Sequence, residues 1–253
     1  MNRIAMVVHD KKPMASEAAT TLANTCATRG VEALVVSGDV LPDNVEAVVG
    51  VGGDGTVLRA GALAMAEDLP VAGINVGRVG YLAEFAVAEI EAFVDALASG
   101  RLRVFTVMTV AVRGPGFVAT GINDVVIEKV VSERIIEIGV AINGRRFAEY
   151  RTDGLIIATP VGSTAYSLSA GGPVVDPEVE ALVMTPIAPH SLLSRSLVVS
   201  PDAEIGVTVE IDRPARVNVD GREIAVVEPG AHVTVARGSR SVRFLTLDTH
   251  PFP

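Results

Sequence analysis

The first hundred residues alternate short apolar runs with segments of helical periodicity, and this order limits the possible folds more than any other feature. Nearly continuous apolar runs such as Val45–Val51 are typical of strands buried on both faces. The predicted strands are Arg3–Val8, Glu32–Val36, Val45–Val51 and Pro70–Ile74. The predicted helices are Met14–Thr28, with Met14, Ala18, Leu22 and Cys26 on one face, Val57–Glu67, and a stripe of Val87, Ile90, Val94 and Leu97. This order predicts an α/β domain with a Rossmann-like parallel sheet over residues 1–100.

The pattern changes after Gly100, where most apolar runs are short and rich in Val and Ile. Turn signals such as Asn143-Gly144 and Asp220-Gly221 separate these runs. The predicted strands are Val107–Val112, Val125–Val130, Ile135–Ile142, Leu155–Thr159, Ile205–Ile211, Arg216–Val219 and Val242–Leu247. A mostly β second domain is therefore expected over residues 101–239, with one helical insert between Ser163 and Ala170.

Composition excludes several classes of protein. The 253 residues carry 21 Lys and Arg against 30 Asp and Glu, so the net charge of -9 disfavours a nucleic-acid partner. Mean hydropathy is +0.43, yet charges or glycines interrupt every apolar run before the ~18 residues that a membrane-spanning helix needs. The single Cys26 rules out an internal disulfide framework and a thiolate metal cluster. The apolar run before His9 is too short for a signal peptide, so a cytoplasmic location is expected.

The segment Gly52-Gly53-Asp54-Gly55-Thr56 follows an apolar strand and opens a predicted helix. Glycines in such a turn let backbone N–H groups approach a phosphate, and the helix N-terminus adds partial positive charge. A carboxylate would repel phosphate unless it has a task, so Asp54 is a candidate to take a proton from a hydroxyl or to hold Mg²⁺. The alternative is a tight turn in which Asp54 is only an N-cap.

A second glycine-rich turn, Gly73–Leu82, follows the next predicted strand. In a parallel sheet both turns lie at the carboxyl edge, where ligands bind. There Asn75 can donate to a ligand oxygen and Arg78 can neutralise phosphate, although Arg78 could equally be a solvated side chain.

Two further segments offer polar groups to a ligand. Asn123-Asp124 supplies an amide and a carboxylate, although the pair is also a common turn. Arg151–Pro173 concentrates hydroxyls and glycines around a short predicted helix, with Ser163 as a plausible N-cap. This density favours hydrogen bonding to a polar ligand, and Tyr166 could stack on a flat ring.

Together these motifs resemble those of the NAD kinase family, enzymes that phosphorylate the 2′-hydroxyl of the adenosine ribose of NAD to give NADP. The resemblance covers Val45–Asp220 and rests on Gly52–Thr56, Gly73–Leu82, Asn123-Asp124, Asp153–Pro173, Thr185–His190 and Val219–Gly221, in family order. Residues before about 40 match only in their strand-helix pattern. Val161 stands where the family usually has Thr or Ser, and Asp124 stands where it often has Glu.

The resemblance implies roles for individual residues. Asp54 would be the general base. The donor phosphates would be held by Gly52, Gly53, Gly55, Thr56, Asn75 and Arg59. NAD would be bound by Asn123, Asp124, Arg134, Arg151, Asp153, Thr164, Ala165, Tyr166, Ser167, Leu168, Ser169, Ala188 and Asp220. Asn123 and Asp124 would contact the adenosine half, with Asp153 and Ala188 towards the nicotinamide end; each arginine could instead be a surface residue.

The resemblance also implies an overall design. An all-β, sandwich-like C-terminal domain would follow the α/β domain, and residues 240–253 would return to the first domain. Mg²⁺ or another divalent cation would accompany ATP or polyphosphate, held by phosphates and water rather than by a dedicated protein cluster. NAD, NADP and ATP are the expected ligands, and a dimer or tetramer is expected, with no nucleic-acid or membrane partner.

Other classes of protein share part of this pattern. Lipid kinases of the diacylglycerol or sphingosine type share the Gly-Gly-Asp-Gly-Thr loop, but the hydroxyl-rich segment does not suit an apolar substrate. Phosphofructokinases share only Gly-Gly-Asp-Gly. A regulatory module that binds NAD or NADP without turnover would have no need of Asp54.

Overall fold

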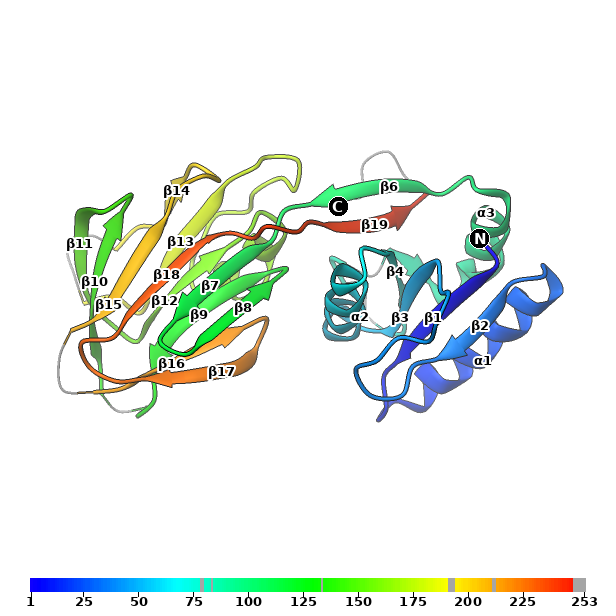
Figure 1. The fold of residues 1–253 in the computed structure, drawn as a ribbon, viewed down its shortest axis with the longest axis horizontal. Helices are drawn as coiled ribbons and strands as arrows, with labels where there is room; N and C mark the ends of the chain where they lie inside the picture. The colour runs from blue at the N-terminus through cyan, green and yellow to red at the C-terminus, as the bar shows by residue number, and fades with distance from the viewer. Residues whose placement is uncertain (78–79, 83, 133, 191–193, 211–212, 248–253) are drawn as a thin grey trace. The chain divides into compact units, whose positions relative to one another are not determined.

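The computed structural model describes the chain except for residues 78–79, 83, 133, 191–193, 211–212 and 248–253. The chain forms two compact units (Figure 1). Residues 1–107 and the segment from Ser241 onward make the first unit, and Met108–Arg240 make the second. Arg78 therefore lies outside the described residues.

The first unit is a parallel sheet with helices on its faces. Its strands are β1 (Arg3–Val8), β2 (Glu32–Val35), β3 (Ala47–Gly52), β4 (Pro70–Asn75), β5 (Phe85–Ala86), β6 (Arg103–Val107) and β19 (Val242–Thr246), in the order β2-β1-β3-β4-β19-β6, with β5 also paired to β4. Its helices are α1 (Pro13–Thr28), α2 (Asp54–Ala66) and α3 (Ile90–Ser99), the last preceded by the 3₁₀ turn η1 (Val87–Glu89). Only β6 runs antiparallel to its neighbour in the sheet as described. The predicted α/β class is confirmed.

Alternate residues of β3 point to opposite faces of the sheet, and these faces are covered by different helices. Val49 and Val51 belong to a buried cluster with residues of α1 and α3. Gly50 points the other way, and a Cβ there would lie 3.0 Å from the Cα of Val57 in α2. The glycine thus lets α2 approach the sheet closely, which positions the loop at the start of this helix.

Three expectations for the first unit are wrong in detail. Met14 is 62% exposed, and the buried residues of α1 are Ala15, Ala18, Ala19, Leu22 and Cys26. A spacing of four residues drifts by about 40° per step around a helix of 3.6 residues per turn, so Met14 falls outside the buried face. Val87 is 39% exposed because it lies in η1 rather than in α3. The domain boundary expected at residue 100 lies after Val107, because β6 pairs with β19 in the first sheet.

The second unit contains two antiparallel sheets that enclose one core. One sheet has the order β11-β10-β15-β18-β7-β8, with β7 (Val110–Gly114), β8 (Phe117–Gly121), β10 (Ile136–Ile142), β11 (Arg145–Thr152), β15 (Ile205–Val209) and β18 (His232–Arg237). The other has the order β14-β13-β12-β9-β16-β17, with β9 (Asp124–Lys129), β12 (Gly154–Ala158), β13 (Leu182–Ile187), β14 (Leu197–Val199), β16 (Ala215–Val219) and β17 (Arg222–Val227). Buried side chains of both sheets form a single cluster, so the predicted β-rich second domain is confirmed.

Along β9, side chains that point into the core of the second unit alternate with side chains that point away from it. Val125 and Ile127 point into the core between the two sheets. Asp124, Val126 and Glu128 occupy the alternate positions and therefore share the opposite face of their sheet. This outer face carries the polar side chains.

The helical insert consists of the 3₁₀ turn η2 (Val161–Thr164) and the single-turn α4 (Tyr166–Ser169). Ser163 is not an N-cap, contrary to expectation. It is fully buried, and its hydroxyl accepts the Val175 N–H at 2.9 Å, which fixes the insert to the following loop.

Within the described residues, no helix is long and apolar enough to cross a membrane.

Candidate functional site

The loop between β3 and α2 places Asp54 at a helix N-terminus. Gly52 ends β3, Gly53 is the N-cap residue, and Asp54 is the first helical residue. The Thr56 N–H donates to the Gly53 carbonyl at 2.8 Å, so the backbone rather than an aspartate side chain closes the first turn. The Asp54 carboxylate is thereby left for other contacts.

Those contacts come from the second glycine-rich turn. The Tyr81 N–H donates to Asp54 Oδ2 at 3.0 Å, and the Leu82 N–H donates to Oδ1 at 3.2 Å. Gly80 lies against the carboxylate so closely that a Cβ there would fall 2.1 Å from Oδ1. Gly52 and Asn75 are paired across β3 and β4, so both turns leave the sheet at its carboxyl edge, as predicted.

A pocket of about 470 Å³ adjoins this loop, and we call it the basic pocket. Its described lining residues are Val8, His9, Asp10, Lys11, Lys12, Gly53, Gly55, Thr56 and Arg59. Arg59 Nη2 donates to the Gly38 carbonyl at 2.7 Å and lies 3.3 Å from Asp39 Oδ1, so a neighbouring loop holds its guanidinium. Gly53, Gly55, Thr56 and Arg59 are brought together as expected, whereas Gly52 and Asn75 are not among the lining residues.

Sequence reasoning missed His9, Lys11 and Lys12. They follow β1, which neighbours β3 in the sheet and runs parallel to it. The available signal was a pair of lysines directly after a strand that ends at the same sheet edge.

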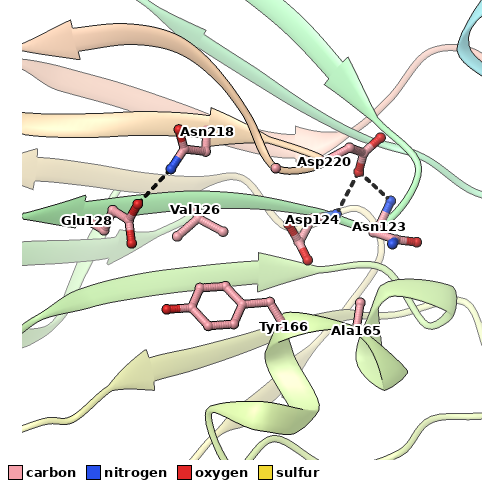
Figure 2. Close-up of a pocket in the computed structure, with 9 residues that line it drawn as sticks. Asn123, Asp124, Val126, Glu128, Ala165, Tyr166, Asn218 and Asp220 are labelled. Carbon is pink, nitrogen blue, oxygen red and sulfur yellow. Dashed lines mark hydrogen bonds between the residues drawn. The ribbon is translucent and has the colours of Figure 1, made fainter. Parts of the chain in front are cut away.

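A second pocket, of about 420 Å³, lies in the second unit (Figure 2). We call it the acidic pocket; it is lined by Asn123, Asp124, Val126, Glu128, Ala165, Tyr166, Asn218, Asp220 and Gly221. Five of these were predicted, namely Asn123, Asp124, Ala165, Tyr166 and Asp220. The outer face of β9 forms one wall and α4 contributes Tyr166. Asn218 Nδ2 donates to Glu128 Oε1 at 2.8 Å across the pair of strands β9 and β16.

Asp220 organises the turn that leads into β9. Its Oδ2 accepts the Ile122 N–H at 2.8 Å, and its Oδ1 accepts the N–H groups of Asn123 at 2.8 Å and Asp124 at 3.2 Å. Asp220 itself has a left-handed backbone, with φ of 48°. These bonds hold Asn123 and Asp124 at the mouth of the strand, so Asp220 positions the two residues rather than only lining the pocket.

The two carboxyl groups here are protonated more readily than ordinary aspartates. Burial raises the pKa of Asp124 to about 7, and the Asp220 carboxylate adds to this shift. Burial also raises the pKa of Asp220, against the three backbone N–H groups, which lower it. The acidic pocket can therefore change its charge near neutral pH.

Two family profiles cover most of the chain. Residues 7–102 match the ATP-NAD kinase N-terminal domain, and residues 122–247 match the ATP-NAD kinase C-terminal domain. The chain belongs to the ATP-NAD kinase family. It is thus a phosphotransferase that acts on NAD with ATP as a donor, and the lipid kinase alternative is not favoured.

Curated relatives agree with this assignment. NAD kinase 1 of Streptomyces avermitilis is 35% identical over 100% of this chain and 85% of its own length. NAD kinase of Mycobacterium tuberculosis is 39% identical over 88% of this chain and 75% of its own length.

Solved structures of family members share the fold. An NAD kinase from Archaeoglobus fulgidus in complex with ATP superposes with a TM-score of 0.82, at 27% identity, over 99% of this chain and 95% of that one. Yeast NADH kinase complexed with NADH gives a TM-score of 0.88 over 97% of this chain and 83% of that one; at 23% identity this likeness concerns the fold alone.

Several residues expected to bind NAD are engaged elsewhere in this kinase. Ser167 is fully buried, and its hydroxyl bonds that of Thr185 at 3.0 Å. Asp153 Oδ1 pairs with Lys129 Nζ at 2.7 Å. The residues expected to bind NAD that do not line the acidic pocket are Arg134, Arg151, Asp153, Thr164, Ser167, Leu168, Ser169 and Ala188. Sequence reasoning in turn missed Val126, Glu128 and Asn218, whose only signal was alternation within their strands, and it named Gly221 only as part of a turn motif.

Proposed function

We propose that Asp54 is the general base of this NAD kinase and acts on the 2′-hydroxyl of the adenosine ribose. The observation that carries the proposal is the fixation of its carboxylate by the Tyr81 and Leu82 N–H groups beside the basic pocket. Each carboxylate oxygen accepts one backbone bond and keeps further acceptor capacity for a substrate hydroxyl. A base held by backbone groups is restricted in orientation, as general-base catalysis requires.

The reaction is a single phosphoryl transfer. The 2′-oxygen forms a bond to the terminal phosphorus of the donor while the bond from that phosphorus to the leaving ADP oxygen breaks. The hydroxyl proton passes to Asp54. The products are NADP and ADP, with no net oxidation or reduction, and positioning and charge supply most of the rate.

The basic pocket suits the donor phosphates. Lys11, Lys12 and Arg59 supply positive charge, and the N-terminus of α2 at Gly55 adds partial positive charge. ATP fits this chemistry, and so does inorganic polyphosphate.

A divalent cation is expected with the donor. The described residues hold no group of three or more His, Cys, Asp or Glu side chains that could bind a metal ion. Mg²⁺ usually keeps several waters and binds through substrate phosphates, so the donor phosphates would supply most of its ligands. Self-association into a dimer or tetramer and a cytoplasmic location stay predictions.

The acidic pocket is the proposed dinucleotide site. Asn123 offers an amide for a base edge, Asp124 offers a carboxyl for ribose hydroxyls, and Tyr166 offers an aromatic face. Its volume lies within the range of small-molecule sites.

The test is turnover with purified protein, NAD, ATP and Mg²⁺, with the position of the new phosphate read by ³¹P NMR. Asp54→Asn should lower kcat by about 10²- to 10⁴-fold while the Kd for NAD stays close to that of the unmodified protein. Glu67→Gln is the matched control, since Glu67 is an exposed carboxylate at the other end of α2. A near-normal kcat for Asp54→Asn would overturn the base assignment.

A further inference from the structure

The acidic pocket has an unusual charge for a site that binds a dinucleotide carrying two phosphates. Its lining includes the carboxyl groups of Asp124, Glu128 and Asp220, and its described lining residues include no lysine, arginine or histidine. Ionised carboxylates here repel phosphates, and their protonated forms attract none, so the pocket suits a nucleoside part of the ligand better than its phosphates.

The cations closest to Glu128 in the sheet register are paired with other carboxylates. Lys129 pairs with Asp153 at 2.7 Å. Arg216 stands opposite Glu128 in the register of β9 and β16, but its Nε pairs with Glu223 Oε2 at 2.8 Å. The hydrogen bond described for the Glu128 carboxylate comes from the neutral amide of Asn218.

The carboxyl groups of Glu128 and Asp124 line the same pocket as the aromatic ring of Tyr166. Glu128, Val126 and Asp124 lie in a row along β9, on the face of the strand that is turned toward Tyr166 of α4 (Figure 2). The pKa of the Tyr166 phenol is raised by its burial and then by Glu128, Asp153 and Asp124, in that order, which places three carboxylates within electrostatic reach of it. Two of these, Glu128 and Asp124, line the pocket itself.

The two forms of the dinucleotide differ in one charge. Oxidised NAD carries a positively charged pyridinium ring, and NADH carries a neutral dihydropyridine of nearly the same size. A ring cation is favoured both by a carboxylate and by an aromatic face. Shape alone discriminates poorly between the two forms, so charge is the property that a site can read.

We propose that Glu128, facing Tyr166 in the acidic pocket, is a specificity-determining residue that makes this kinase prefer NAD over NADH. The nicotinamide ring then lies on the Glu128 side of Tyr166. The inference rests on the proposed role of the acidic pocket as the dinucleotide site.

The test is equilibrium binding without ATP or Mg²⁺, so that it does not depend on turnover. Isothermal titration of the full chain with NAD and with NADH should give an affinity ratio of about ten in favour of NAD. Glu128→Gln keeps the size and the hydrogen bond to Asn218, and should reduce the ratio to about two, mostly by weakening NAD. Glu204→Gln is the control, because Glu204 is an exposed carboxylate of the same unit outside the pocket, and it should leave the ratio unchanged.

A second variant covers the case in which Glu128→Gln does not fold. Asn218→Lys leaves Glu128 in place and sets a cation beside it, so the ratio should fall in the same way. Equal affinities in the unmodified protein, or a ratio that neither variant changes, would overturn the inference. Failure of both dinucleotides to bind would instead overturn the proposed role of the pocket.

Discussion

The basic pocket and the acidic pocket carry opposite charges, and we propose that they bind different parts of the reactants. Lys11, Lys12 and Arg59 surround the start of α2, where phosphates are expected. Asp124, Glu128 and Asp220 line the pocket on the outer face of β9, where a nucleoside is expected. The comparison shows that the net charge of -9 says little about either pocket, because the local charges of the two differ in sign.

The largest effect is expected from a substitution that disturbs the contact between Gly80 and the Asp54 carboxylate. Gly80→Ala would place a methyl group 2.1 Å from the present position of Asp54 Oδ1, so the carboxylate must move. We expect kcat to fall by about 100-fold, because a displacement of about 1 Å is enough for such a loss. Steady-state kinetics measure kcat, and titration should show an unchanged Kd for NAD. A kcat within a factor of three of the unmodified enzyme would mean that the position of Asp54 is not critical.

The buried carboxyl group of Asp124, in the acidic pocket, should make the stability of the protein depend on pH. The pKa of Asp124 is about 7 in the folded chain, above its ordinary value near 4, so the folded state holds a proton that the unfolded state has lost between these pH values. Its contribution to stability is present below pH 4 and is lost as the pH rises through 7. Asp124→Asn imitates the protonated form and should therefore stabilise the protein above pH 7 by roughly 3 kcal/mol, and by less at pH 5.

Thermal unfolding of both proteins at pH 5 and pH 8 measures this difference. Asp202→Asn is the control, since Asp202 is an exposed carboxylate of the same unit. The explanation fails if the advantage of Asp124→Asn over the unmodified protein does not grow with pH.

The lysines of the basic pocket should affect the donor and leave NAD unaffected. The double substitution Lys11→Met and Lys12→Met should raise the KM for ATP by about tenfold and make it less sensitive to salt. Arg145→Met, an exposed charge on β11, provides the control. An equal rise in the KM for NAD would contradict the division between the two pockets.

The smallest effect is expected where the chain departs from its family. Val161 is almost fully buried in η2, and Val161→Thr adds one hydroxyl beside the dinucleotide segment. We expect a change of about 1 kcal/mol or less in NAD binding, measured by titration. A large loss of activity would mean that η2 affects catalysis beyond one contact to the adenosine half.

Local patterns predicted much of the fold. The apolar runs and glycine-rich turns predicted β1, β3, β4 and α2, because a buried parallel strand and the turn after it each have a characteristic pattern within a few residues. They also joined Val107 and Val112 into one strand, which the structure divides. Thr109 lies between β6 and β7, and its hydroxyl donates to the carbonyl of Arg240, a partner far along the chain that no local pattern indicates.

The site follows the same rule. Asp54 and Tyr166 stand in motifs with a strong local signature, so sequence alone singled them out. The Asn218 amide that holds Glu128, and the Gly38 carbonyl that holds Arg59, are supplied by segments that meet only through the fold. Ser167 illustrates the converse, because its motif suggested ligand binding while packing directs its hydroxyl to Thr185.

The position of β19 bears on how the chain is made. This strand lies between β4 and β6 in the first sheet, yet the ribosome delivers it after all of the second unit. The nascent first unit therefore exposes the edge of β4, and β6 has no partner, until residues 242–246 emerge. The sheet that carries Asp54 is thus closed only after the second unit has been made. A chain terminated before residue 242 would contain every residue of the acidic pocket but would lack a strand of the sheet behind Asp54.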